Sequence, residues 1–164
     1  MQAEWRPIPE FPKYSVSSEG YVRNEESGNR MSMSVNQSGI VYVRLARSGV
    51  QHARGVALLV ANVFLNDKPN KTFDCPVNLD GDRFNNRAAN LIWRPRWFAT
   101  KYFQQLDEAH FDDPYPIEEL NTREQFYNPW DASKKYGLLQ ADILLSVCNG
   151  TMVWPTKQTF RRSE

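Results

Sequence analysis

Residues 77–93 read VNLDGDRFNNRAANLIW, and this stretch decides how the centre of the chain folds. It follows Pro76 with a short apolar run, and residues 91–93 form a second run of β-prone side chains. Between them, residues 80–82 (DGD) signal a turn, because Gly accepts positive φ and Asp hydrogen-bonds its own backbone. These features predict a β-hairpin with a long polar loop.

The DGD sequence has a second interpretation as part of a calcium-binding loop. An EF-hand loop needs a bidentate Glu at its twelfth position. When Asp80 is counted as the first residue, the twelfth is Leu91, which has no ligating atom. The sequence therefore favours a turn and excludes an EF-hand.

The same stretch resembles the core of phage-type HNH endonucleases. Their pattern is an apolar residue, Asp or Asn, His, apolar, Asn or Asp, Gly, a polar loop with paired Asn, then Asn-Leu-x-Trp. The matching residues are Val77, Asn78, Leu79, Asp80, Gly81, Asp82, Asn85, Asn86, Asn90, Leu91 and Trp93. No His stands between Asn78 and Leu79, and the spacing is one residue short.

The resemblance also assigns roles to the residues of this site. The missing His is the general base of the family, Asn78 takes the place of a metal ligand, and Asn90 is structural. Ala99 stands where the following helix supplies a further ligand. A neutral amide binds a hard cation weakly, and His52 and His110 lie in other segments. The resemblance thus implies a degenerate site with no catalytic residue, no metal and no other cofactor.

Upstream, residues 4–24 carry a dense second pattern. Its members are Trp5, Pro7, Ile8, Pro9, Phe11, Tyr14, Val16, Ser17, Gly20, Val22 and Arg23. They resemble NUMOD4, a short module that precedes HNH cores in many phage and intron-encoded nucleases. Apolar alternation around the turn at 17–20 predicts a β-hairpin. Arg23 and Asn24 at its exit are candidates for contact with the DNA backbone.

Residues 39–65 predict strands followed by a helix. The helical stretch VALLVANVF (residues 56–64) is apolar nearly all round. Such a helix is either buried on both faces or exposes a surface that binds another protein, and burial is the favoured interpretation. A second helix is expected from about Arg96 to Ala109.

The carboxyl-terminal part predicts an acidic connector and a helical module. Pro and acidic residues in 110–121 favour an extended tether. Two short helices, each ended by Gly, predict a helix-turn-helix from residues 131–150. Residues 116–162 resemble NUMOD1-type repeats at the carboxyl ends of such nucleases. The matching residues are Ile117, Leu120, Thr122, Phe126, Ala132, Gly137, Leu138, Ile143, Cys148 and Gly150.

The predicted fold class is therefore α+β, in four segments. They are a NUMOD4-like antiparallel β module at 1–35, a degenerate ββα-metal (HNH) core at 36–109, the tether at 110–121 and the helix-turn-helix-like module at 122–164. This order resembles the plan of phage intron-type homing endonucleases, in which the ends grip an extended DNA site and the middle segment cuts it. For this chain the resemblance implies that the DNA-gripping ends are present and the cutting segment is damaged.

Charge is distributed unevenly along the 164 residues, although the net charge is only +1. Segment 1–105 carries 14 Lys or Arg against 9 Asp or Glu, segment 106–131 carries 1 against 8, and segment 132–164 carries 5 against 2. Phosphate binding needs local positive charge, which both ends supply. No apolar run is long enough for a membrane span, the amino-terminal residues do not read as a signal peptide, and two Cys without a C-x-x-C motif favour a reduced compartment.

The sequence leaves three functions open. The first is an inactive HNH-family protein that binds double-stranded DNA, for example as a regulator, in the cytoplasm of a phage-infected bacterium. The second is a protein-binding inhibitor or modulator of a host or phage enzyme, and the third is a weak residual nickase. The candidate DNA-contacting residues are Arg23, Asn24, Arg44, Arg47, Arg94, Arg96, Lys101, Lys134, Lys135, Gln140, Lys157, Arg161 and Arg162.

Overall fold

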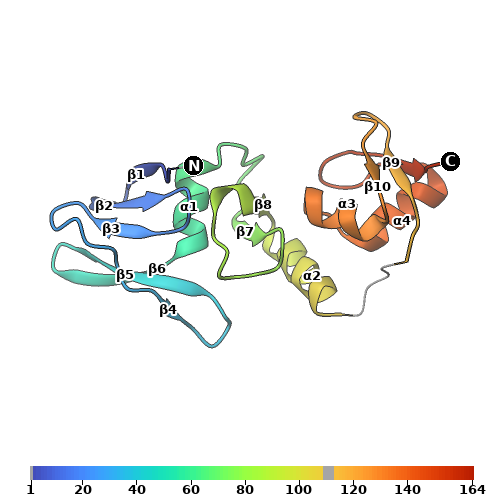
Figure 1. Cartoon of the computed structure of the whole chain (residues 1–164). Coiled ribbons are helices and arrows are strands. Elements are labelled where there is room, and N and C mark those ends of the chain that lie inside the picture. The colour runs from blue at the N-terminus through green and yellow to red at the C-terminus, as the bar shows by residue number, and fades with distance from the viewer. Residues whose placement is uncertain (1, 109–112) are drawn as a thin grey trace. The chain divides into compact units, whose positions relative to one another are not determined.

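The computed structural model describes residues 2–108 and 113–164. The chain divides into two compact units, Met1–Arg96 and Trp97–Glu164. Both combine antiparallel strands with helices, so the predicted α+β class is confirmed (Figure 1). His110, which the sequence places outside the hairpin, lies among residues 109–112, outside the described part of the chain.

The amino-terminal unit contains two three-stranded antiparallel sheets and the central hairpin. The elements of the first sheet are β1 (Trp5–Ile8), β2 (Phe11–Ser17) and β3 (Val22–Asn24). The second sheet consists of β4 (Ser34–Val35), β5 (Val41–Arg47) and β6 (Val50–Gly55). The hairpin pairs β7 (Cys75–Asn78) with β8 (Leu91–Arg94), and a 3-10 turn (η1, Ala88–Asn90) leads into β8.

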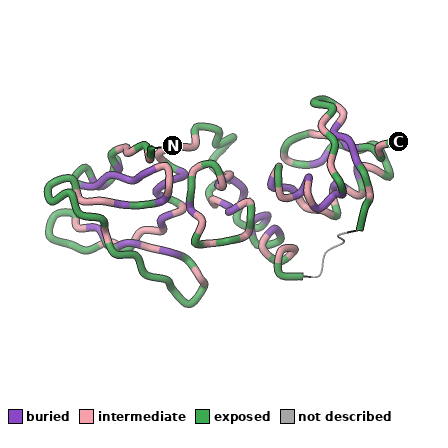
Figure 2. The backbone as a smooth tube through the Cα atoms, in the orientation of Figure 1, coloured by how far each residue is buried: buried purple, intermediate pink, exposed green. Residues whose placement is uncertain are grey.

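Helix α1 (Val56–Phe64) covers the core of this unit, because its apolar side chains reach strands of both sheets and the hairpin. Val56, Leu59 and Val60 are buried with the inward side chains of β1, β2, β3 and β5. Only part of the opposite side of the helix is open, where Leu58 is 36% exposed. Helix α1 is therefore buried along one face, through Val56, Leu59, Val60 and Ala61, and not on both faces as favoured from the sequence (Figure 2).

The carboxyl-terminal unit builds a small core between a sheet and two helices. Its strands are β9 (Ile117–Glu119), β10 (Gln125–Phe126) and β11 (Phe160–Arg162), in the order β10-β9-β11. The two helices are α3 (Pro129–Tyr136) and α4 (Gln140–Asn149). The buried side chains between them are Ile117, Ala132, Leu138, Ile143, Val153 and Phe160.

Local sequence signals set the ends of α3 and α4. The side chain of Asn128 caps α3 by accepting the backbone N–H of Asp131 at 2.9 Å, and Pro129 occupies the first turn. Gly137 and Gly150 end the two helices in the left-handed conformation, with φ of 61° and 67°. The predicted helix pair with Gly stops is therefore present, while its role as a helix-turn-helix remains a prediction.

Helix α2 (Arg96–Asp107) follows the hairpin, and nearly all of it belongs to the second unit. Gln105 explains why. Its Nε2 atom donates to Oγ of Ser133 and to the carbonyl oxygen of Leu138, both at 3.0 Å, and its Oε1 accepts the N–H of Gln140 at 2.9 Å. The predicted segment 36–109 grouped this helix with the hairpin, but these bonds hold it against the α3–α4 turn.

Candidate nucleic-acid interface

The central hairpin buries an amide side chain at the end of its first strand. Asn78 lies opposite Leu91 in the β7–β8 pair and is 4% exposed. Its Nδ2 atom donates to the carbonyl oxygen of Asn85 at 2.9 Å and to Oδ1 of Asn86 at 3.0 Å. Asn78 therefore holds the long loop through its N–H groups.

A second amide secures the loop beside the other strand. Asn90 Nδ2 donates to Oδ1 of Asp80 and to the carbonyl oxygen of Asn85, both at 2.8 Å, while its Oδ1 accepts the N–H of Asp80 at 3.2 Å. Asp80 also accepts the N–H of Asp82 at 2.9 Å and the side-chain amide of Asn85 at 2.6 Å. This geometry suits the structural role predicted for Asn90.

The turn between β2 and β3 docks directly on this loop. The N–H of Ala88 donates to the carbonyl oxygen of Ser18 at 2.8 Å, and Arg87 forms an ion pair with Glu19 at 2.9 Å. The loop residues are more than sixty positions away in sequence from the turn. The amino-terminal β module thus supports the hairpin as well as forming a sheet of its own.

Gly20 makes this docking possible. It has φ of +85°, which favours Gly over residues with a side chain. A Cβ atom at this position would lie 3.0 Å from the carbonyl oxygen of Asn86. The turn and the loop therefore approach each other as closely as their backbones allow, and only Gly satisfies both conditions.

The donor set of the hairpin does not fit a divalent metal ion. Asn78 faces its neighbours with N–H groups, and the carboxylate of Asp80 accepts hydrogen bonds from the loop. Ala99 lies in α2 and has no ligating atom, whereas His52 lies in β6 with its ring beside an aromatic ring of β2. Across residues 2–108 and 113–164, no group of three or more His, Cys, Asp or Glu side chains comes together as a metal site.

Comparisons with known proteins agree with this architecture. The family model of the NUMOD4 motif matches residues 4–46. Two proteins of Acanthamoeba polyphaga mimivirus, Uncharacterized HNH endonucleases L245 and L247, are 32% and 33% identical over 93 and 92 residues. These matches cover 57% and 54% of this chain. They cover 27% and 23% of the relatives, so the chain spans about a quarter of their length.

The fold comparison covers nearly the whole chain. A structure of the HNH homing endonuclease I-HmuI, described for DNA binding and cleavage, matches with a TM-score of 0.57 and 20% identity over 98% of both chains. The chain is thus similar in sequence to HNH endonucleases over about half of its length, and similar in fold to an HNH homing endonuclease over nearly all of it. The resemblance to NUMOD4 and HNH proteins is thereby confirmed, whereas the NUMOD1-like module, the phage origin and the bacterial host remain predictions. Among the described residues, no helix is long and apolar enough to cross a membrane.

The predicted contacts at the exit of the NUMOD4-like hairpin already have partners. Arg23 Nε donates to Glu25 Oε1 at 2.8 Å, and its guanidinium lies 4.3 Å from the ring centroid of Trp5. Asn24 Oδ1 accepts two backbone N–H groups of the following turn, at 2.8 and 3.3 Å. Both residues therefore order the module, and their predicted DNA contacts would require these side chains to rearrange or to serve both roles.

The remaining predicted cations of the first unit differ in accessibility. Arg44 and Arg47 are exposed on β5, with the guanidinium of Arg47 5.4 Å from the ring centroid of Phe11. Arg94 is only 4% exposed, and its Nη1 donates to the carbonyl oxygen of Trp93 at 2.9 Å. The prediction that Arg94 contacts DNA is wrong for this fold, because a buried guanidinium does not reach a phosphate.

Several predicted cations of the second unit form ion pairs. Lys134 pairs with Asp131 at 3.3 Å, and Lys135 pairs with Glu124. Gln140 is half-buried at the start of α4, where its N–H bonds to Gln105. Exposed pairs of this kind contribute little to stability, but the acids reduce the positive potential that a phosphate would meet.

Arg161 and Arg162 are neighbours in β11 with different surroundings. Nε and Nη2 of Arg161 donate to Oε2 of Glu118 at 2.8 and 2.7 Å, and this ion pair holds the pKa of the Glu118 carboxyl below its ordinary value. Arg162 lies with its guanidinium 4.9 Å from the ring centroid of Tyr115 and is exposed. A phosphate contact by Arg161 stays a prediction and would compete with this ion pair, while Arg162 has no such acidic partner in the described part of the chain.

The acidic tether requires a correction in its second half. Within the predicted tether 110–121, residues Ile117–Glu119 form β9, the central strand of a sheet, and are buried. The extended backbone agrees with the predicted tether. The carboxylates of Glu118 and Glu119, however, are buried in the sheet. Burial by itself would raise the pKa of Glu119, yet hydrogen bonds from the N–H and hydroxyl of Thr122, both at 2.7 Å, keep it below its ordinary value.

Three predicted cations remain exposed near or within the second unit. They are Arg96 and Lys101 on α2 and Lys157 in the loop before β11. The Nζ atom of Lys101 lies 5.5 Å from the ring centroid of Trp97. The aromatic side chains of this region are not among the predicted contacts, although Trp97 beside Arg96 and near Lys101 is a sequence signal that points to them.

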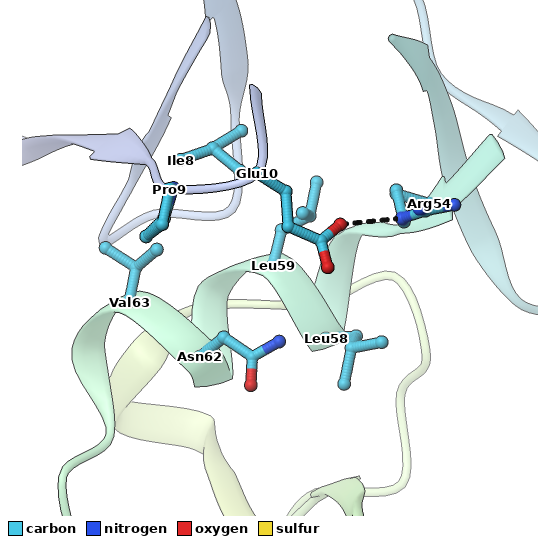
Figure 3. A pocket seen from close by; sticks show the side chains of 8 residues that line it. All are labelled: Ile8, Pro9, Glu10, Arg54, Leu58, Leu59, Asn62 and Val63. Carbon is cyan, nitrogen blue, oxygen red and sulfur yellow. Dashed lines mark hydrogen bonds and ion pairs between the residues drawn. The ribbon is translucent and has the colours of Figure 1, made fainter. Parts of the chain in front are cut away.

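A small apolar cavity of about 290 Å³ lies between the β1–β2 turn and α1. At its edge, Glu10 accepts a hydrogen bond from Arg54 at 3.2 Å (Figure 3). The pair ties the β1–β2 turn to β6 and leaves only one further polar side chain, Asn62, on the wall. This cavity therefore offers no constellation for catalysis. Its lining residues are Ile8, Pro9, Glu10, Arg54, Leu58, Leu59, Asn62 and Val63.

Proposed function

We propose that this protein binds double-stranded DNA and does not cleave it, and that it acts by occupying or regulating a site. The observation that carries the proposal is the hydrogen bonding of Asn78. Its amide is committed to the loop carbonyl of Asn85 and to Asn86. An HNH-type reaction needs a base beside this position and oxygen or nitrogen ligands for a cation, and the hairpin uses its polar side chains as loop supports instead.

The β5–β6 hairpin supports DNA binding. The two strands form a ribbon of six paired positions, from Tyr42–Gly55 to Arg47–Val50. Arg44 and Tyr42 point to the same side, since they are two residues apart on one strand. A two-stranded ribbon fits the major groove of B-DNA, and exposed Arg side chains provide contacts to phosphates or guanine.

A shallow groove of about 390 Å³ adds shape to this face. It opens where the β4–β5 turn meets the ribbon, and Arg44 lies in its wall. Polar Asn and aromatic Tyr side chains beside an Arg suit contacts to base edges and backbone. The lining residues are Asn36, Ile40, Tyr42, Arg44, Ala53, Arg54 and Gly55.

Titration of duplex DNA at several salt concentrations tests the binding half of the proposal. The dissociation constant is expected to rise steeply with salt, because bound cations release counterions from DNA. Arg44→Ala is expected to lower the salt slope by about one. Lys71→Ala removes an equally exposed charge from the loop before β7 and serves as the control that leaves the slope unchanged. A dissociation constant that does not depend on salt contradicts DNA binding.

Incubation with supercoiled DNA and Mg²⁺ or Mn²⁺ tests the second half. We expect no nicked product. Nicking by the wild-type protein that persists in Lys71→Ala and disappears in Asn78→Ala would contradict the proposal and favour the residual nickase.

A protein partner is the alternative function, and one feature of α4 favours it. Leu145 on this helix is 55% exposed, and Met152 after it is 68% exposed. Neither Lys nor Arg occurs in α4. If duplex binding is absent, Leu145→Ser in a pull-down from infected cells tests this surface, and loss of a partner recovered with wild type supports the alternative.

A further inference from the structure

Two Trp side chains that are distant in sequence form an exposed aromatic stack in the second unit. Trp97 at the start of α2 is 56% exposed, and Trp154 in the loop before β11 is 44% exposed. Their ring centroids are 5.2 Å apart with an angle of 27° between the planes. Large apolar side chains are costly to leave in water, so a pair that remains this open indicates a surface used for binding.

The stack rests on a rigid support. Phe98 is 1% exposed and contacts both indoles, at centroid distances of 5.8 Å to Trp97 and 5.5 Å to Trp154. Beside Trp154 in the loop before β11, Val153 is buried, and its N–H donates to the carbonyl oxygen of Gln158 at 2.7 Å. The two rings are therefore held in place before any partner arrives, which lowers the entropic cost of binding.

The charge around the stack is positive. The Nζ atom of Lys101 lies 5.5 Å from the Trp97 ring centroid. Arg96, directly before Trp97 in the sequence, and Lys157, three positions after Trp154, are exposed. Residues 96–106 and 143–163 contain neither Asp nor Glu. An aromatic surface with cations and without acids suits a nucleic acid, since bases stack on the rings while the cations attract phosphates.

We infer that Trp97 and Trp154 form a platform for an unpaired nucleobase, so that the protein binds DNA that exposes such a base. This inference rests on the proposed binding of DNA and adds a preference to it. Within an intact duplex both faces of each base are already stacked on neighbours. An indole gains a base partner only where the stack is interrupted, as in a single strand or beside an extruded nucleotide.

Binding of a thymine oligonucleotide and of a random duplex of the same length, at one salt concentration, tests the inference. The single strand should quench the Trp fluorescence of the wild-type protein. Trp97→Ala and Trp154→Ala should each weaken single-strand binding by about tenfold, equivalent to about 1.4 kcal/mol and within the range for stacking one base. Duplex affinity should stay unchanged.

Two further variants keep the test specific. Tyr127→Ala removes another exposed aromatic ring of the same unit, 56% exposed, and should leave single-strand affinity intact. Trp154→Phe keeps an aromatic ring and should retain most of the affinity, which separates stacking from a folding defect. Equal losses in all four variants, or none in the Trp→Ala pair, overturn the platform. If the duplex is not bound either, the proposed function fails as well.

Discussion

The loop of the HNH-like hairpin and the carboxyl-terminal sheet both fix a carboxylate, but they do so with different partners. In the loop, Asp80 receives neutral N–H donors from Asn90, Asn85 and the backbone. In the sheet, Glu118 receives the guanidinium of Arg161. Neutral amide donors carry no net charge, whereas the attraction between two charged side chains is screened by salt.

The difference bears on function in both regions. At the hairpin, the amides of Asn78 and Asn90 hold the loop backbone, and no His stands beside Asn78 where the HNH pattern has its base. In β9, Glu118 forms an ion pair with Arg161, which the sequence predicts to bind phosphate. Asn78, which the sequence pattern places at a metal ligand, thus supports the loop of the hairpin. Arg161, which the sequence predicts to bind phosphate, supports the carboxyl-terminal sheet.

The largest expected effect breaks the docking that supports the loop. Gly20→Ala should lower the free energy of unfolding of the first unit by about 3 kcal/mol, at the upper end of the range for a strained backbone, because the new Cβ also meets the carbonyl oxygen of Asn86 at 3.0 Å. Gly28→Ala is the matched control. Its φ is +73° but nothing lies within 4 Å, so it should cost about 1 kcal/mol. Equal losses in urea unfolding would show that docking contributes nothing.

Removing one amide of the loop should have the next largest effect. Asn90→Ala removes the hydrogen bonds of its side chain to the Asp80 carboxylate, to the Asp80 N–H and to the carbonyl oxygen of Asn85, which together should cost about 1–3 kcal/mol. The melting temperature should fall. The affinity for duplex DNA should stay unchanged, because the candidate DNA contacts lie outside the loop. Asn62→Ala on the exposed side of α1 should leave the melting temperature nearly unchanged, and so would Asn90→Ala if the network were dispensable.

The ion pair of the sheet should weaken in acid. The pKa of Glu118 lies below its ordinary value of 4.5, so its contribution is present above pH 4.5 and is lost as the pH falls through the folded pKa. Thermal unfolding of wild type should therefore show a loss of stability in this acidic window. Glu118→Gln should be less stable at neutral pH and should lose less on acidification. Parallel pH profiles of the two proteins would contradict the assignment.

The smallest effect separates the two neighbouring Arg residues of β11. Arg162→Ala should lower the salt slope of duplex binding by about one, because its guanidinium is exposed and has no ion pair with an acid in the described part of the chain. Arg161→Ala should leave the slope unchanged and lower the melting temperature, since it removes the closer of the two guanidinium groups that pair with Glu118. The reverse assignment of slope and stability would show that Arg161, rather than Arg162, contacts DNA.

The sequence by itself determined the elements whose signals are local. Turn residues at 17–20 and 80–82, the apolar run 56–64 and the Gly residues that end α3 and α4 predicted strands, helices and their limits close to those observed. These features follow from backbone conformation and side-chain periodicity within a few residues. The missing His beside Asn78 was visible for the same reason.

Tertiary structure alone decided which polar and aromatic side chains meet. The burial of Arg94, the pairing of Glu118 with Arg161 and the stacking of Trp97 on Trp154 join residues that no local pattern connects. The acidic stretch became a central strand because a cation 43 positions away and local N–H donors offset the cost of burying its carboxylates. Composition fixes how many charges a chain carries, but only the folded contacts fix which of them remain for a ligand.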